Sequence, residues 1–105
     1  MTLFLHALFW ALLFGGSRPV TDSDWRNAVF PVRSSLQSHA DALGYDGNVT
    51  SLLLLSTPHD ANVQLVNGKL YTGRILLEDG STSFCISVHH TFRGDNATLV
   101  GVEYC

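Results

Sequence analysis

Apolar residues in the first half of the chain recur at spacings of three and four, which is the period of an amphipathic helix. The members of this stripe are Trp25, Val29, Val32, Leu36, Ala40 and Leu43. Thr21-Asp22-Ser23-Asp24 supplies candidate N-cap residues, and Gly44 supplies a C-cap. Pro31 interrupts the stripe, and proline is tolerated only in the first turn of a helix. We therefore predict a regular helix from about Pro31, preceded by an irregular or kinked turn over Ser23–Phe30.

The period changes after Gly47, where extended runs alternate with turn-forming residues. The Leu-rich run Val49–Thr57 predicts a buried strand, and Pro58-His59-Asp60 predicts a bulge or bend that breaks it. Further strands are predicted over Leu70–Leu77, Thr82–His90 and Ala97–Cys105, and turns over Gln64–Gly68, Glu78–Ser81 and Arg93–Asn96. This order predicts an α+β fold with one helix packed on a four- to five-stranded antiparallel sheet.

The N-terminal region has a different character. Leu3–Phe14 is an almost unbroken apolar run, and Gly15-Gly16-Ser17 follows it. The run is shorter than the roughly 20 residues that span a bilayer, but it suits the apolar core of a secretory signal peptide. We therefore predict a signal peptide over residues 1–17, cleaved after Gly15 or Ser17, and a single secreted, extracellular domain over residues 18–105. The alternative, a buried N-terminal helix, needs a partner surface that so small a domain can hardly supply.

Two cysteines and two glycosylation sequons agree with secretion. Cys85 and Cys105 are an even pair in a secreted chain, so we expect them to form a disulfide. They lie too far apart in sequence for a pair of metal ligands. Asn48 and Asn96 each begin an Asn-x-Thr sequon after turn-forming residues, so both are expected to carry glycans in exposed positions of a glycoprotein.

The charge of the chain and the placement of its histidines argue against several other classes of function. The formal net charge is −3 and no basic cluster exists, which argues against nucleic acid and anionic membranes as partners. His59-Asp60 and His89-His90 are candidates for an acid–base pair or for metal ligands. Neighbouring residues of a strand point to opposite faces, so His89 and His90 are poorly placed to share a metal. We therefore expect no catalytic activity, no cofactor and no metal.

The stretch Gln64-Leu65-Val66-Asn67-Gly68 carries the strongest functional signal. It places apolar residues at a sharp reversal, because Asn67 and Gly68 tolerate positive φ. The stretch resembles the Gln-x-Val-x-Gly loop of the cystatins, which block papain-like cysteine proteases. The order of the other features is also similar to that of small secreted cystatins of the arthropod type, over residues 15–105. These features are the glycine pair, a helix with Pro31–Leu36, a Leu-rich strand, an Asp-Gly hairpin and two cysteines around the last hairpin.

The resemblance implies inhibition by reversible binding, with no chemical reaction between inhibitor and protease. In that family, a wedge of three segments enters the protease cleft, and inhibition is reversible and competitive. Here the segments would be a glycine trunk at Gly16, the first loop Gln64–Gly68 and a second hairpin. The expected partner is a papain-like protease of the cathepsin L or B type, bound by a monomer. The protease-binding residues would be Gly16, Gln64, Leu65, Val66, Asn67, Gly68 and Phe92.

Two departures from the cystatin pattern leave a second hypothesis open. The second hairpin has no Pro-Trp pair, and only Phe92 offers an aromatic substitute. Cleavage after Ser17 would also remove Gly16. Loss of an aromatic anchor can remove much of the binding energy of an interface. The alternative function is therefore a cystatin-fold secreted binding protein with weak or no protease inhibition.

Overall fold

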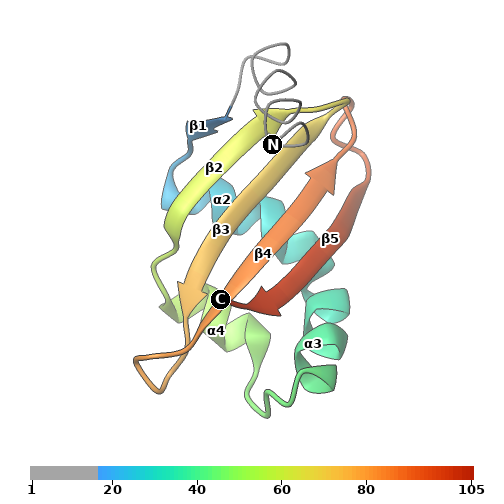
Figure 1. Cartoon of the computed structure of the whole chain (residues 1–105). Coiled ribbons are helices and arrows are strands. Elements are labelled where there is room, and N and C mark those ends of the chain that lie inside the picture. The colour runs from blue at the N-terminus through green and yellow to red at the C-terminus, as the bar shows by residue number, and fades with distance from the viewer. Residues whose placement is uncertain (1–16) are drawn as a thin grey trace, which may run out of the picture.

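The computed structural model describes residues 17–105 as a five-stranded antiparallel sheet with helices against one face (Figure 1). The strands are β1 (Ser17–Pro19), β2 (His59–Leu65), β3 (Lys69–Leu76), β4 (Ser83–His90) and β5 (Ala97–Tyr104), and they pair in chain order. The helical segments are α2 (Asp22–Val29), η1 (Phe30–Val32), α3 (Arg33–Ala42) and α4 (Val49–Leu55). The predicted α+β class and sheet are therefore confirmed. The predicted signal peptide falls in residues 1–16 and the first residue of β1, so most of it lies outside the described residues.

The long helix begins earlier than predicted. α2, η1 and α3 follow one another without a gap as a helix of 21 residues across the sheet. The expectation of an irregular turn over Ser23–Phe30 was wrong. The Thr21 side chain caps the helix by accepting a hydrogen bond from the Asp24 N–H at 3.1 Å, and Pro31 falls in the first positions of the short 3₁₀ turn. The missing N–H of proline thus coincides with the 3₁₀ turn that separates the two α-helical segments. The helix ends as expected at Gly44, whose φ is +92°.

The Leu-rich run is a helix, so the prediction of a buried strand over Val49–Thr57 was wrong. Asn48 caps α4 by accepting a hydrogen bond from the Ser51 N–H at 3.0 Å. Val49, Leu52 and Leu53 are buried, and their spacing is that of a helical stripe. A short apolar run without alternation fits a buried strand and a helix equally well, and the cap at Asn48 decides here for the helix.

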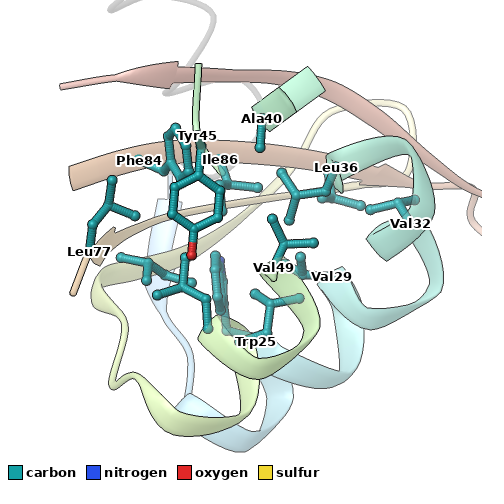
Figure 2. Close-up of a cluster of buried hydrophobic side chains, with 14 residues drawn as sticks. Trp25, Val29, Val32, Leu36, Ala40, Tyr45, Val49, Leu77, Phe84 and Ile86 are labelled. Atoms are coloured by element: carbon teal, nitrogen blue, oxygen red, sulfur yellow. The ribbon is translucent and has the colours of Figure 1, made fainter. Parts of the chain in front are cut away.

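The core lies between the long helix, α4 and the sheet (Figure 2). Its largest fully buried side chains include Trp25, Phe84 and Leu36. Trp25 rests on the backbone of β3 at Gly73, where an added Cβ would lie 2.6 Å from the indole ring. The apolar stripe read from the sequence is therefore the core face of the helix, except for Leu43, which is exposed.

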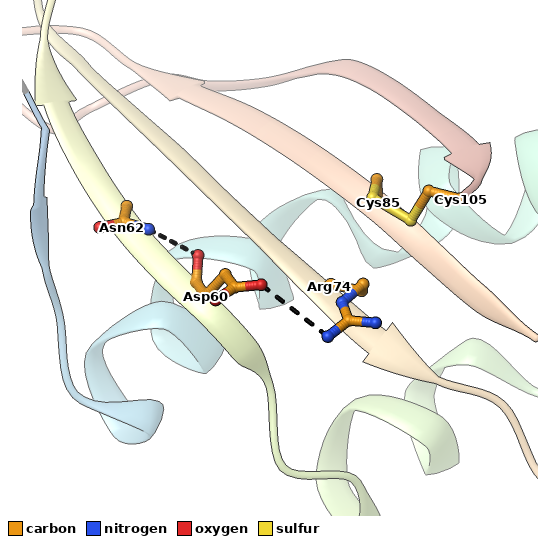
Figure 3. Close-up of polar contacts among 5 residues, drawn as sticks. All are labelled: Asp60, Asn62, Arg74, Cys85 and Cys105. Atoms are coloured by element: carbon orange, nitrogen blue, oxygen red, sulfur yellow. Dashed lines mark hydrogen bonds and ion pairs between the residues drawn. A yellow bond between two sulfur atoms is a disulfide. The ribbon is translucent and has the colours of Figure 1, made fainter. Parts of the chain in front are cut away.

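The predicted break near Pro58-His59-Asp60 is a bulge at the start of β2. The register with β3 shifts between His59 and Asn62, and Asp60 has a φ of +56°. The Asn62 side-chain amide donates a hydrogen bond to the Asp60 carbonyl at 2.7 Å, and Asp60 pairs with Arg74 at 3.8 Å (Figure 3). Both charged side chains are exposed, so this ion pair holds the bulge only weakly.

The disulfide Cys85–Cys105 is confirmed, and it ties β4 to the residue after β5 (Figure 3). It closes a loop with a sequence separation of 20, which corresponds to a stabilisation of about 3 kcal/mol. A disulfide of this kind is typical of chains that fold in an oxidising compartment. In residues 17–105, no helix has the length and apolar character needed to cross a membrane.

Candidate functional site

Three segments of the chain meet at one end of the sheet, which we call the wedge end (Figure 1). They are the start of β1, the first loop (Gln64–Gly68), whose first two residues end β2, and the second loop (Thr91–Asn96) between β4 and β5. The strand register brings them together. Ser17 lies opposite Gln64, Lys69 opposite both Leu65 and His90, and His90 opposite Ala97.

The first loop makes the reversal that its sequence predicts. Asn67 and Gly68 have φ values of +50° and +118°, and the Val66 N–H donates a hydrogen bond to the Gly68 carbonyl at 3.2 Å. Leu65 is 43% exposed, Val66 is half-buried and Asn67 is exposed. The loop therefore presents apolar surface at the end of the sheet within a tightly turned backbone.

The last two residues of β4 contact the first loop. The His89 Nε2 lies 2.9 Å from the Asn67 carbonyl oxygen, which it reaches as a donor. Gly68 is buried, and a Cβ there would collide with the His90 carbonyl and lie 2.7 Å from the His89 Nε2. The strand that leads into the second loop thus supports the first loop directly.

His89 and His90 form hydrogen bonds to different parts of the fold. While His89 contacts the first loop, the His90 Nε2 lies 2.7 Å from the Ala28 carbonyl at the end of α2. His59 is exposed, and Asp60 faces Arg74. Among residues 17–105, no group of three or more His, Cys, Asp or Glu side chains is placed to hold a metal ion.

The second loop is ordered by its own hydrogen bonds. The Thr91 N–H donates to the Asn96 carbonyl at 3.1 Å, and the Gly94 N–H donates to the Thr91 carbonyl at 2.9 Å. The Thr91 hydroxyl donates to the Asp95 carboxylate at 2.7 Å. Phe92 lies within this turn and is 73% exposed, so a large aromatic side chain stands in solvent at the wedge end.

The third predicted contact, Gly16, lies outside the described residues. Its neighbour Ser17 is the first residue of β1 and lies opposite Gln64, so the chain enters the sheet beside the first loop. Sequence reasoning did not predict this short strand. Cleavage after Gly15 would leave β1 whole, whereas cleavage after Ser17 would remove its first residue.

A cavity of about 520 Å³ opens between β1, the start of α2 and the sheet, beside the wedge end. Its lining includes Arg18, Asp24, Lys69 and Tyr71. Charges of both signs therefore flank the site on this side.

Each sequon begins at an exposed asparagine. Asn48 is the N-cap residue of α4 and lines a cavity with Glu78, at the end of the sheet opposite the wedge end. Asn96 is the last residue of the second loop. A glycan at Asn96 would thus stand at the wedge end, and a glycan at Asn48 would stand away from it.

No family model, curated protein or solved structure matches this chain. The fold itself, a long helix packed against a five-stranded antiparallel sheet, is consistent with the cystatin-like class.

Proposed function

We propose that this chain is a secreted, reversible and competitive inhibitor of papain-like cysteine proteases of the cathepsin L or B type. One observation carries the proposal: the start of β1, the first loop and the second loop converge at one end of the sheet. This is the order and arrangement of contact segments that the resemblance to cystatins implies. The first loop also retains the Gln-x-Val-x-Gly pattern at Gln64–Gly68.

The geometry of the wedge end supports binding by a preformed surface. Leu65 and Phe92 offer exposed apolar area, and burial of such area contributes about 25 cal/mol per Å² before the costs of association. The contact from His89 to Asn67 fixes the first loop before binding. A loop that is already ordered loses less conformational entropy when it enters a cleft.

Phe92 takes the place that the Pro-Trp pair holds in cystatins. It is a smaller aromatic residue than tryptophan, but the second loop presents it to solvent. Aromatic side chains are prominent among the residues that dominate binding energy. We therefore assign Phe92 as the contact of the second hairpin, with Val66 and Leu65 as those of the first.

The absence of a Pro-Trp pair favours a second candidate function. In this alternative, the chain is a secreted binding protein that keeps the cystatin-like fold and has a partner other than a protease. The two candidates differ in a measurable way, because only the inhibitor requires that Val66 and Phe92 enter an active cleft.

The test is a titration of the oxidised, secreted protein against papain, with the mature N-terminus read by mass spectrometry. The variants are Val66→Asp and Phe92→Ala. Leu55→Asp serves as the matched control, because Leu55 is 86% exposed at the end of α4, away from the wedge end (Figure 1). We expect stoichiometric inhibition by the wild type and by Leu55→Asp. A buried charge without a partner is costly, so Val66→Asp should raise the inhibition constant at least about 100-fold.

Unfolding curves in urea should be alike for Val66→Asp and Leu55→Asp, since both positions are at least partly exposed. Folded wild-type protein that leaves papain fully active at micromolar concentration would contradict the proposal and favour the alternative function. Equal inhibition by Val66→Asp and the wild type would also contradict it.

A further inference from the structure

The formal charges of the chain are separated along the sheet. At the end opposite the first loop, carboxylates gather on the last turn of α3, the α3–α4 connection, the β3–β4 connection and the end of β5. We call this the acidic end, and its members are Asp41, Asp46, Glu78, Asp79 and Glu103. Contacts join these segments, because the Tyr45 hydroxyl donates to Glu78 and the Tyr104 hydroxyl donates to the Leu43 carbonyl. Arg74 in β3 faces Asp60.

Around the two loops of the wedge end, basic side chains outnumber acidic ones, with Lys69 and Arg93 against Asp95. Lys69 begins β3 directly after the first loop, Arg93 follows Phe92 in the second loop, and Arg18 belongs to β1. Three carboxylates lie near these bases: Asp22 and Asp24 in the first turn of α2, and Asp95 in the second loop. Asp24 lines the cavity that Arg18 and Lys69 also line, and Asp95 accepts a hydrogen bond within the second loop. His89 and His90 lie on the same end of β4 and are neutral in this formal count.

Distance and screening decide which charges a partner senses. β3 runs from Lys69 to Leu76, so the two ends lie on the order of 25 Å apart at about 3.4 Å per residue. The Debye length is about 8 Å at 0.15 M ionic strength and about 30 Å at 0.01 M. At physiological salt, a surface that approaches the first loop therefore senses the local positive charge. At very low salt it also senses the net charge of −3.

We infer that the wedge end binds a papain-like protease whose cleft rim is acidic, and that Lys69 and Arg93 orient the approach. This inference rests on the proposed function and adds the charge of the partner. Attraction at the wedge end and repulsion at the acidic end favour the one orientation in which the loops lead. Complementary charge of this kind raises association rates more than it lowers dissociation rates.

The experiment measures association rate constants by stopped-flow inhibition against two papain-like proteases, one acidic and one basic, at ionic strengths from 0.01 to 1 M. The variants are Lys69→Glu and Arg93→Glu. Arg74→Glu is the control with the same change in net charge. Arg74 is exposed and lies about 17 Å along β3 from Lys69, beyond the Debye length at 0.15 M.

At 0.15 M we expect Lys69→Glu and Arg93→Glu each to slow association with the acidic protease at least about threefold, with Arg74→Glu unchanged. For the wild type, association with the acidic protease should be fastest at intermediate salt, because the net negative charge repels at 0.01 M and screening removes the attraction at 1 M. The basic protease should show no such maximum.

The outcomes separate the two proposals. The inference is overturned if Lys69→Glu and Arg93→Glu both associate as fast as the wild type, or if Arg74→Glu slows association equally. Either result leaves the inhibitor function standing. Absence of inhibition of either protease by the folded wild type overturns both.

Discussion

Gly73 lets the indole of Trp25 rest directly on the backbone of β3. An added Cβ would lie 2.6 Å from the Nε1 and Cε2 atoms of the ring, which is closer than real Cβ contacts come. The indole is only 1% exposed, and within residues 17–105 its Nε1 has no hydrogen-bond partner. Burial of an N–H without a partner is costly, so the packing of the ring against Gly73 and the core must outweigh that cost.

The prediction at this position is that Gly73→Ala loses about 1–3 kcal/mol of unfolding free energy, because Trp25 must move away from the strand and disturb the core. Urea unfolding followed by tryptophan fluorescence measures the loss. Gly101→Ala in β5 is the matched control, since a Cβ there meets nothing within 4 Å. Equal midpoints for the two variants would show that the contact between Trp25 and Gly73 does not limit stability.

The sequence predicted that Trp25 faces the core, but not the glycine beneath it. The helical stripe identifies the buried face of an element from local spacing. The contact joins residues 48 positions apart in the numbering, and only the register of the sheet against the helix brings them together. The same holds for His89 and Asn67, whose contact could be found only once the pairing of β3 with β4 was known.

Among the elements, Tyr45 links the α3–α4 connection to the β3–β4 hairpin. Its hydroxyl donates a hydrogen bond to the Glu78 carboxylate at 2.7 Å. Its ring meets that of Phe84 edge-on, with the ring centroids 5.4 Å apart (Figure 2). Burial raises the pKa of Tyr45 well above its usual range, and the hydrogen bond to Glu78, its charge and that of Asp46 raise it further. The neutral phenol is thus part of the packing between these elements.

Alkaline pH should weaken this link. Below about pH 10, Tyr45 is neutral in both the folded and the unfolded chain. Above that pH, the unfolded chain releases a proton that the folded chain retains, so unfolding becomes more favourable as the pH rises. Tyr45→Phe removes the hydrogen bond, at a cost of about 1 kcal/mol at neutral pH, but it also removes this alkaline loss. The stability gap between wild type and variant should therefore narrow from pH 9 to pH 11 in urea unfolding. Parallel profiles would contradict the assignment.

The helices and strands show which sequence patterns predicted secondary structure correctly and which did not. The three hairpin-linked strands after residue 68 were predicted because turn-forming residues, Asn-Gly, Asp-Gly and Arg93–Asn96, fix the ends of extended runs. The Leu-rich run was mistaken for a strand, although Val49, Leu52 and Leu53 have helical spacing and Asn48 is a capping residue. Those signals compete with the β-like appearance of a short apolar run. The whole of α2 was missed because Pro31 was given more weight than the cap at Thr21.

For the whole molecule, the meander brings one sequon and both functional loops to the same end. Asn96 closes the second loop only a few residues from Phe92, whereas Asn48 stands at the acidic end beside Glu78. A glycan is bulky and hydrated. Attached at Asn96, it would compete for the space that a protease needs around the wedge end. The two sequons therefore form a natural matched pair for testing where the partner binds.

Protein from a eukaryotic secretory host should be glycosylated at both asparagines, which peptide mass spectrometry checks. Thr98→Val removes the Asn96 sequon and suits an exposed strand position, because β-branched residues favour strands. Thr50→Ala removes the Asn48 sequon in α4. We expect Thr98→Val to speed association with papain at least about threefold, and Thr50→Ala to leave it unchanged, because only the Asn96 glycan must be displaced from the approach path. Enzymatic removal of the glycans should give the wild type the rate of Thr98→Val. A wild type glycosylated at Asn96 that inhibits as fast as Thr98→Val would mean that the partner does not approach over the second loop, and Phe92 would then lose its assigned contact.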